Sequence, residues 1–165
     1  MIIFGIDPGL SGAIAILNKK KVLNLHEMPV MSEGKKNKKQ LNSAQLVSII
    51  NEHLSGNNDE VAVVVEQVNA MPGQGVTSMF NFGQTFGAIK GVCAALQLPM
   101  YLIRPSKWKK HFELINSSKD ASRTKAIQMY PNLSNDLAKK KDVNKSDAIL
   151  IARYFYETKA LTDPK

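Results

Sequence analysis

The distribution of apolar residues along the chain predicts alternating strands and helices. Short apolar runs bounded by turn residues predict strands, and apolar positions repeated at helical spacing predict helices. The predicted strands are residues 2–7, 12–17, 22–28, 61–66 and 99–103. One helix is predicted to begin at residue 43. Four further helices are predicted over residues 78–97, 105–113, 118–130 and 144–158. Residues 29–42 are rich in lysine and poor in apolar side chains, so they are interpreted as a loop.

The order of these elements predicts an α/β fold, with helices on both faces of a mixed five-stranded sheet. Only short turns separate the first three strands, which therefore form an antiparallel meander. The continuously apolar run VAVVVE is typical of a strand that is covered on both faces. A chain of 165 residues with 44% hydrophobic residues can bury one sizeable core. We therefore expect a single domain over residues 1–165.

Two acidic residues end apolar strands. Asp7 closes the first strand before a turn rich in glycine, and Glu66 closes the fourth. If these strands are parallel neighbours, with the second strand on the other side of the first, the sheet changes direction between them. Ligand sites of α/β sheets lie at such points, so the two carboxylates are expected to face each other. An aspartate at the start of a turn also has a structural explanation, because it can cap the turn.

A third acidic region lies near the C-terminus. Asp147 shares the apolar face of the last predicted helix, although the helix dipole alone also favours an acid in the first turn. Asp142 precedes this helix and can reach the same site from the loop. Carboxylates gathered in one place repel one another unless a proton or a cation intervenes. Oxygen ligands without a histidine or cysteine cluster favour Mg²⁺, with Mn²⁺ able to substitute, over zinc.

The formal net charge of +8 indicates a polyanionic partner, with nucleic acid the foremost class. The basic residues gather in the loop, on the helix around Trp108 and on the helix that follows it. A solvated cationic face is the alternative explanation for any one of them. The candidate DNA contacts are Lys35, Lys36, Lys107, Lys109, Lys110 and Arg123.

Cysteine content and hydropathy bear on where the protein works. Cys93 is the only cysteine, which excludes an internal disulfide and a cysteine-rich zinc site and fits a reducing compartment. No apolar run reaches the roughly 18 residues of a membrane-spanning helix, and the N-terminus lacks a secretory pattern. We therefore expect a cytoplasmic protein without membrane contacts.

The segments FGIDPGLSGAIAIL, VVVEQV and SDAILIARY resemble the bacterial and phage RuvC-type Holliday-junction resolvases of the ribonuclease H-like superfamily. The resemblance covers nearly the whole chain and includes NFGQTFGAIKGVCAAL and RPSKWKKHF, the latter more typical of phage members. It implies a homodimeric, metal-dependent crossover junction endodeoxyribonuclease. Such an enzyme resolves four-way DNA junctions in recombination and repair, by paired nicks in opposing strands through two-metal phosphodiester hydrolysis.

The resemblance also assigns roles by position. Asp7, Glu66 and Asp147 match the catalytic, metal-binding acids of the family, whereas Lys109 and Arg123 match residues that neutralise phosphates near the scissile bond. It leaves open a nuclease of broader specificity for branched DNA.

The chain departs from the cellular members at two positions. They carry an aspartate three residues before the last acid, where this chain has Asn144. We assign the fourth catalytic and metal-ligand position to Asp142, with Asn144, which can coordinate through its amide oxygen, as the alternative. Some cellular enzymes stack an aromatic residue in the opened junction where this chain has Asn69. Candidates for that role are Met71, Met79 and Phe80. Because Asn144 brings no charge, an inactive DNA-binding relative also stays open.

Glycines recur every four residues in the predicted helix 78–97, at Gly83, Gly87 and Gly91. Each costs about 1 kcal/mol relative to alanine, so the stripe indicates close approach of another backbone. That backbone belongs to the sheet, to the second subunit of a dimer, or to DNA.

An ATPase is the alternative from another functional class. GIDPGLSG also resembles the first phosphate loop of actin-like and sugar-kinase folds. Such a protein needs a second glycine-rich phosphate loop and an adenosine site, and neither is found in this sequence.

Overall fold

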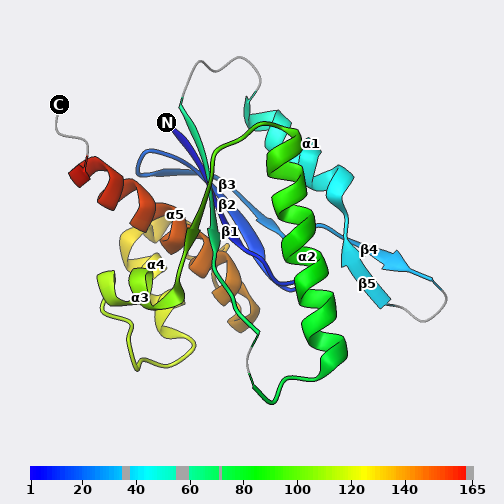
Figure 1. The fold of residues 1–165 in the computed structure, drawn as a ribbon. Coiled ribbons are helices and arrows are strands. Elements are labelled where there is room, and N and C mark those ends of the chain that lie inside the picture. Colours follow the sequence, from blue (N-terminus) through cyan, green and yellow to red (C-terminus); the bar gives the residue numbers. More distant parts are fainter. Residues whose placement is uncertain (35–37, 55–59, 71, 163–165) are drawn as a thin grey trace.

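The computed structural model describes residues 1–34, 38–54, 60–70 and 72–162, and a five-stranded mixed sheet lies at its centre (Figure 1). The strand order is β3-β2-β1-β6-β7. β1 pairs antiparallel with β2 and parallel with β6, as predicted. The sheet therefore changes direction beside β1. The strands are β1 (Ile2–Asp7), β2 (Ala13–Asn18), β3 (Lys21–Glu27), β6 (Val61–Glu66) and β7 (Met100–Ile103).

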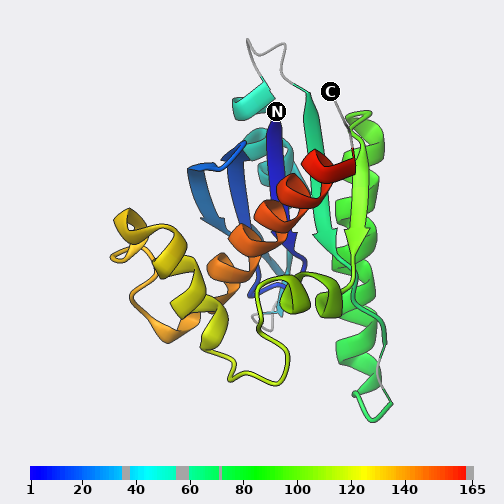
Figure 2. The same cartoon turned by 90° about the vertical axis from the view of Figure 1, so that its left-hand side faces the viewer.

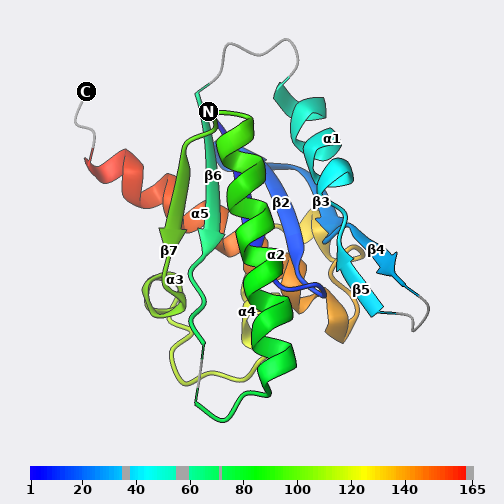
Figure 3. The same cartoon turned by 45° about the vertical axis from the view of Figure 1, so that its right-hand side comes forward.

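Helices cover both faces of the sheet, which confirms the predicted fold class. α1 (Ser43–Leu54) and α2 (Val76–Ala95) lie on one face, and α5 (Val143–Thr162) crosses the other (Figures 2 and 3). Alternating strand residues supply the two cores, since Phe4 packs with the α1 and α2 side and Ile3 with the α5 side. No helix of the described part of the chain is long and apolar enough to cross a membrane.

Shorter helices connect β7 to α5. They begin with α3 (Pro105–His111), in which proline occupies the first turn, where its missing N–H costs nothing. α4 (Ala121–Met129) follows and contacts α5. Two single turns of 3₁₀-helix, Pro131–Leu133 and Lys140–Asp142, complete the connection.

Gly5 allows α5 to lie unusually close to β1. A Cβ atom at this position would lie 2.2 Å from the carbonyl oxygen of Ala148 and 2.8 Å from Cβ of Ala152. Since real Cβ atoms do not approach other atoms so closely, a side chain here would push the helix off the strand. The end of β1, which carries Asp7, therefore lies near the first turns of α5.

The segment 29–42, predicted as a loop, contains two short strands instead. β4 (Val30–Glu33) and β5 (Lys38–Leu41) pair antiparallel and form a separate two-stranded sheet that projects from the body beside α1 (Figure 1). Lysines interrupt the apolar pattern of this hairpin, and Leu41 at its base is the only residue of either strand that is fully buried. The sequence signal was weak because the hairpin stands largely in solvent.

The glycine stripe of α2 faces away from the sheet. A Cβ atom built on Gly83, Gly87 or Gly91 would meet no atom within 4 Å. The residues of α2 that pack on the sheet lie on the opposite side of the helix, among them Ile89 and Cys93. The sheet is therefore excluded as the backbone that approaches the glycine stripe, which leaves a second subunit or DNA.

Candidate active site

Three acids approach one another at the carboxyl ends of β1 and β6. The parallel pairing of these strands brings Asp7 and Glu66 to the same edge of the sheet. Asp147 joins them from the second turn of α5, which Gly5 holds against β1. The negative charges of Glu66 and Asp147 both act on Asp7, and that of Glu66 acts on Asp147. The structure thus brings together the three acids singled out from the sequence.

The protein environment disfavours ionisation of all three acids. Burial, followed by the repulsion of Glu66 and Asp147, raises the pKa of Asp7 from 3.8 to about 7. Burial also raises the pKa of Asp147 to about 6, with a further contribution from Glu66. The pKa of Glu66 is raised by burial as well. A cluster of acids that oppose one another's ionisation is typical of a functional site.

The donor set suits a hard divalent cation. Asp147 accepts a hydrogen bond from Ser122, but its buried Oδ1 atom has no hydrogen-bond partner among the residues that the structure describes. A buried carboxylate oxygen that lacks a donor is satisfied by a cation, and carboxylate oxygens are the ligands preferred by Mg²⁺ and Mn²⁺. Within the described residues, no three His, Cys, Asp or Glu side chains already form a metal-binding group. Binding of a cation therefore requires the carboxylates to draw closer together.

Trp108 and Lys109 bring polar groups from α3 to the acids. The indole N–H of Trp108 donates a hydrogen bond to Oε1 of Glu66 over 2.9 Å. The Nζ atom of Lys109 lies 5.3 Å from the centre of the Trp108 ring. Against the effect of burial, the charge of Lys109 lowers the pKa of all three acids. Lys109 therefore supplies a positively charged side chain to the group of three acids.

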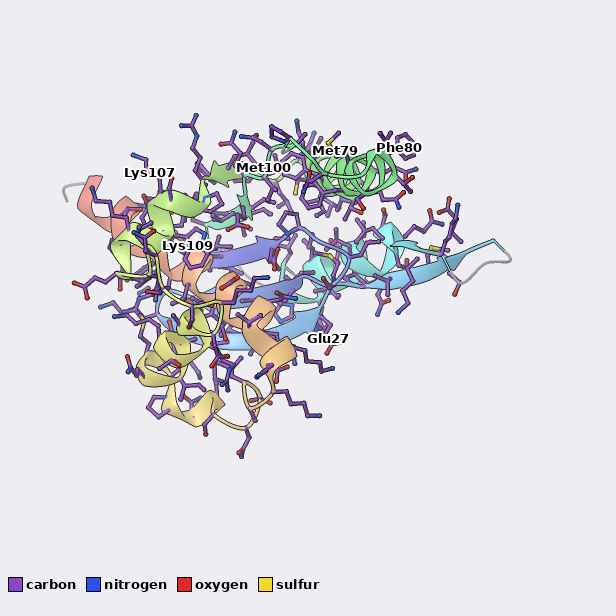
Figure 4. All side chains as sticks on the ribbon, turned by 90° about the horizontal axis from the view of Figure 1, so that it is seen from below. Glu27, Met79, Phe80, Met100, Lys107 and Lys109 are labelled. Carbon is purple, nitrogen blue, oxygen red and sulfur yellow. The ribbon has the colours of Figure 1, made fainter. Side chains whose placement is uncertain are left out.

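Two cavities at this end of the molecule have Asn144 as a common lining residue. One, of about 410 Å³, is lined by Trp108, Lys109, Lys119, Ser122 and Asp147. The other is an open groove of about 680 Å³ that reaches from the turn after β1 to α2, and its lysines are Lys39, Lys141 and Lys145. Asn144 lines both and donates a hydrogen bond to the carbonyl oxygen of Ser11. Figure 4 views this end of the molecule, with Lys107 and Lys109 of α3 on one side and Phe80 of α2 on the other.

Asp142 is not brought into this group. Its Oδ2 accepts a hydrogen bond from the backbone N–H of Lys139, and its Oδ1 pairs with Nζ of Lys145 at 3.1 Å. Although burial opposes it, these bonds hold the pKa of Asp142 below its usual value. The carboxylate caps a turn of 3₁₀-helix. Metal binding by Asp142 would require both contacts to break, so the structure favours a capping role over the predicted fourth ligand.

Arg123 is likewise engaged in holding the fold together. Its guanidinium donates two hydrogen bonds to the carboxylate of Asp120, over 2.6 and 2.8 Å, and a third to the carbonyl oxygen of Leu137. Few donors remain for a phosphate, and the structure does not support the predicted DNA contact. Lys107 and Lys110 are exposed on α3. Lys35 and Lys36 lie outside the described residues.

Sequence reasoning did not assign Trp108 and Ser122 to the site, and it considered Asn144 only as the alternative to Asp142 for the fourth ligand. Trp108 was noted only as the aromatic residue between candidate DNA-binding lysines. A signal was present, because it is the single tryptophan of the chain and directly precedes Lys109. Nothing in the sequence indicates that Ser122, on α4, contacts Asp147.

Comparison with known proteins identifies the fold. No family model matches the chain, and no curated protein matches its sequence. Among solved structures, Thermus thermophilus RuvC in complex with a Holliday junction substrate superposes with a TM-score of 0.63 at 17% identity, over 100% of this chain and 98% of RuvC. The chain has the RuvC fold.

Two further resolvases share this fold. The fowlpox virus Holliday junction resolvase matches with a TM-score of 0.54 and 19% identity, over 96% of this chain and 99% of the viral one. The yeast mitochondrial Holliday junction resolvase Ydc2 matches with a TM-score of 0.53 and 16% identity, over 96% of this chain and 78% of Ydc2. The RuvC fold thus accounts for the chain from end to end.

Proposed function

We propose that this protein is a metal-dependent endonuclease that resolves four-way DNA junctions by nicks in two opposing strands. The observation that carries the proposal is the group formed by Asp7, Glu66 and Asp147, with its unpartnered buried oxygen, at the carboxyl edge of a RuvC fold. Three proteins that share the fold are Holliday junction resolvases. The net charge of +8 supports a nucleic-acid substrate.

Asp7, Glu66 and Asp147 are the residues that would hold Mg²⁺ or Mn²⁺. When bound, such ions lower the pKa of a water molecule and offset the charge of the phosphate in phosphodiester hydrolysis. Asp7 is central, because the charges of both other acids act on it. Lys109 supplies positive charge for the phosphate oxygens as negative charge builds up on them.

The surroundings of the acids provide a path for DNA. The cavity beside Asp147 and the groove that carries Lys39, Lys141 and Lys145 share Asn144 in their walls. We propose that the strand to be cut lies along this path, while exposed Lys107 and Lys110 contact neighbouring phosphates. The hairpin formed by β4 and β5, whose exposed residues include Lys38 and Lys39, projects from the body (Figure 1), and we propose that it contacts one arm of the junction.

Substituting Lys109 with alanine should lower the cleavage rate of bound junction about 10- to 100-fold, because the positive charge that acts on all three acids is lost. Single-turnover cleavage at saturating protein measures this rate. Lys107→Ala, an exposed lysine on the same helix, is the matched control and should weaken binding without changing the rate of the bound complex. An equal loss of rate in both variants would contradict the assignment of Lys109.

We further propose that the protein is a homodimer, with α2 of each copy packed along the glycine stripe. The stripe is open to solvent at Gly83, Gly87 and Gly91, and two large exposed apolar side chains, Val76 and Phe80, continue it toward the active-site end of α2. Glycines allow two helices to approach closely. A pair of active sites also suits a junction in which two strands are cut.

The dimer can be tested at Gly87. Gly87→Glu should leave the folded monomer intact, because a side chain there meets no atom within 4 Å and glycine is the poorer helix former. We expect the variant to be monomeric by light scattering and to lose coordinated nicking of the second strand. Lys20→Glu, in the turn between β2 and β3, introduces an acid away from α2 and should remain dimeric. A dimeric Gly87→Glu protein would place the interface elsewhere.

The proposed function is tested with labelled four-way junction, Y-fork and linear duplex, each incubated with the protein in Mg²⁺ or in EDTA. Paired nicks on the junction alone, abolished by EDTA, are the expected result. Equal cleavage of the fork would widen the activity to branched DNA in general. Binding to the junction without metal-dependent cleavage of any substrate would contradict the proposed nuclease activity and indicate a DNA-binding protein without catalysis.

A further inference from the structure

Trp108 combines complete burial with a polar contact to the active site. Its side chain has 0% exposure and packs in the core between the sheet and α5, with neighbours that include Phe112 and Ala148. The one polar atom of the ring, Nε1, donates its hydrogen to Glu66. A buried indole N–H needs an acceptor, so the ring and the carboxylate fix each other's position.

The ring of Trp108 contacts two groups of opposite charge. Its edge holds Oε1 of Glu66 at 2.9 Å, and the Nζ atom of Lys109 lies over its face, 5.3 Å from the ring centre. The negative face of an aromatic ring attracts a cation, and its N–H attracts an anion. One rigid group, anchored in the core, therefore sets the positions of both an acid and a lysine of the site.

We infer that Trp108 is a positioning residue for metal binding at Glu66, an inference that rests on the proposed function. Because the indole occupies Oε1, the carboxylate is held in one orientation and Oε2 is left for a cation. Groups that orient metal ligands in this way commonly change metal affinity or activity by about 10- to 100-fold when removed. Trp108 acts through Glu66 and Lys109 and does not itself touch the reacting phosphate.

The test is Trp108→Phe, which keeps an aromatic face for Lys109 and removes the N–H that holds Glu66. We expect Mg²⁺ affinity, measured by calorimetry on the protein without DNA, to fall about 10- to 100-fold. The kcat for junction cleavage should fall with it, while the KM for the junction stays unchanged. Phe112→Leu is the matched control, because Phe112 belongs to the same buried core as Trp108 but has no side-chain hydrogen-bonding group. It should lower thermal stability and leave Mg²⁺ affinity and kcat unchanged.

A second measurement does not depend on the folding of any variant at Trp108. Because Trp108 is the only tryptophan, its fluorescence reports on this one site. We expect Mg²⁺ to change the emission of the unaltered protein, with the midpoint found by calorimetry, and Glu66→Gln to abolish the change. The inference is overturned if the tryptophan emission does not change when Mg²⁺ is added. It is also overturned if Trp108→Phe and Phe112→Leu lose Mg²⁺ affinity equally. Failure of the proposed function is distinct, since it appears as absent cleavage in the unaltered protein.

Discussion

Asp7→Asn is expected to reduce junction cleavage about 10³-fold or more while leaving junction affinity unchanged. Asparagine keeps the shape of aspartate and removes its charge, and Asp7 is the acid on which both other carboxylates act. Cleavage is measured under single-turnover conditions in Mg²⁺, and affinity by fluorescence anisotropy in EDTA. The two measurements separate loss of catalysis from loss of binding.

The matched control for this prediction is Asp142→Asn. Both oxygens of Asp142 are engaged by Lys139 and Lys145, so its loss should lower stability and change the cleavage rate only a few-fold. If Asp142→Asn were as inactive as Asp7→Asn at a temperature where both are folded, Asp142 would be a ligand after all. Residual activity of Asp7→Asn near that of the unaltered protein would remove Asp7 from the catalytic group.

The same substitution is expected to stabilise the metal-free protein at alkaline pH. Folding raises the pKa of Asp7 from 3.8 to about 7, so between these values the folded state binds more protons than the unfolded state. The free energy of unfolding therefore falls as pH rises through this window and levels off above it. Asp7→Asn lacks this titration, and we expect it to be more stable at pH 8 by about 2–4 kcal/mol, but not at pH 4.

Urea denaturation in EDTA at the two pH values measures this difference. Asp136→Asn, which removes a charge from an exposed position, should show no pH-dependent gain. Adding Mg²⁺ should narrow the gap at pH 8, because a ligand that binds only the folded state stabilises the unaltered protein. A variant that is no more stable at pH 8 than the unaltered protein would mean that burial and the neighbouring acids do not raise the pKa of Asp7.

The sheet and the three acids could be predicted because they follow from strong local patterns. Continuous apolar runs identified β1 and β6, and the short turn after Asp7 fixed β2 as an antiparallel neighbour. Once β1 and β6 are parallel neighbours, acids at their ends must lie at one edge. The position of Asp147 followed from its place on the apolar face of α5.

Features that leave no clear pattern in the sequence could not be predicted in the same way. Asp142 and Arg123 carry the charges that a nuclease site needs, but each is occupied by a partner within three residues, Lys145 or Asp120. The spacing of the glycines defined a stripe on α2 without indicating which way it faces, because glycine has no side chain to bury. The hairpin of β4 and β5 escaped detection because most of its strand positions are exposed and polar or charged side chains interrupt any apolar pattern.

Gly5 has a consequence for finding distant relatives of this chain in sequence data. At 16–19% identity the resolvases that share the fold are beyond ordinary sequence comparison, and acids alone are too frequent to be diagnostic. The close packing of β1 on α5 adds a second requirement: glycine two residues before the first acid, and a small residue, here Ala152, five residues after the last. A search pattern that includes Gly5 and Ala152 with the acids selects for the spacing of the site as well as its charge.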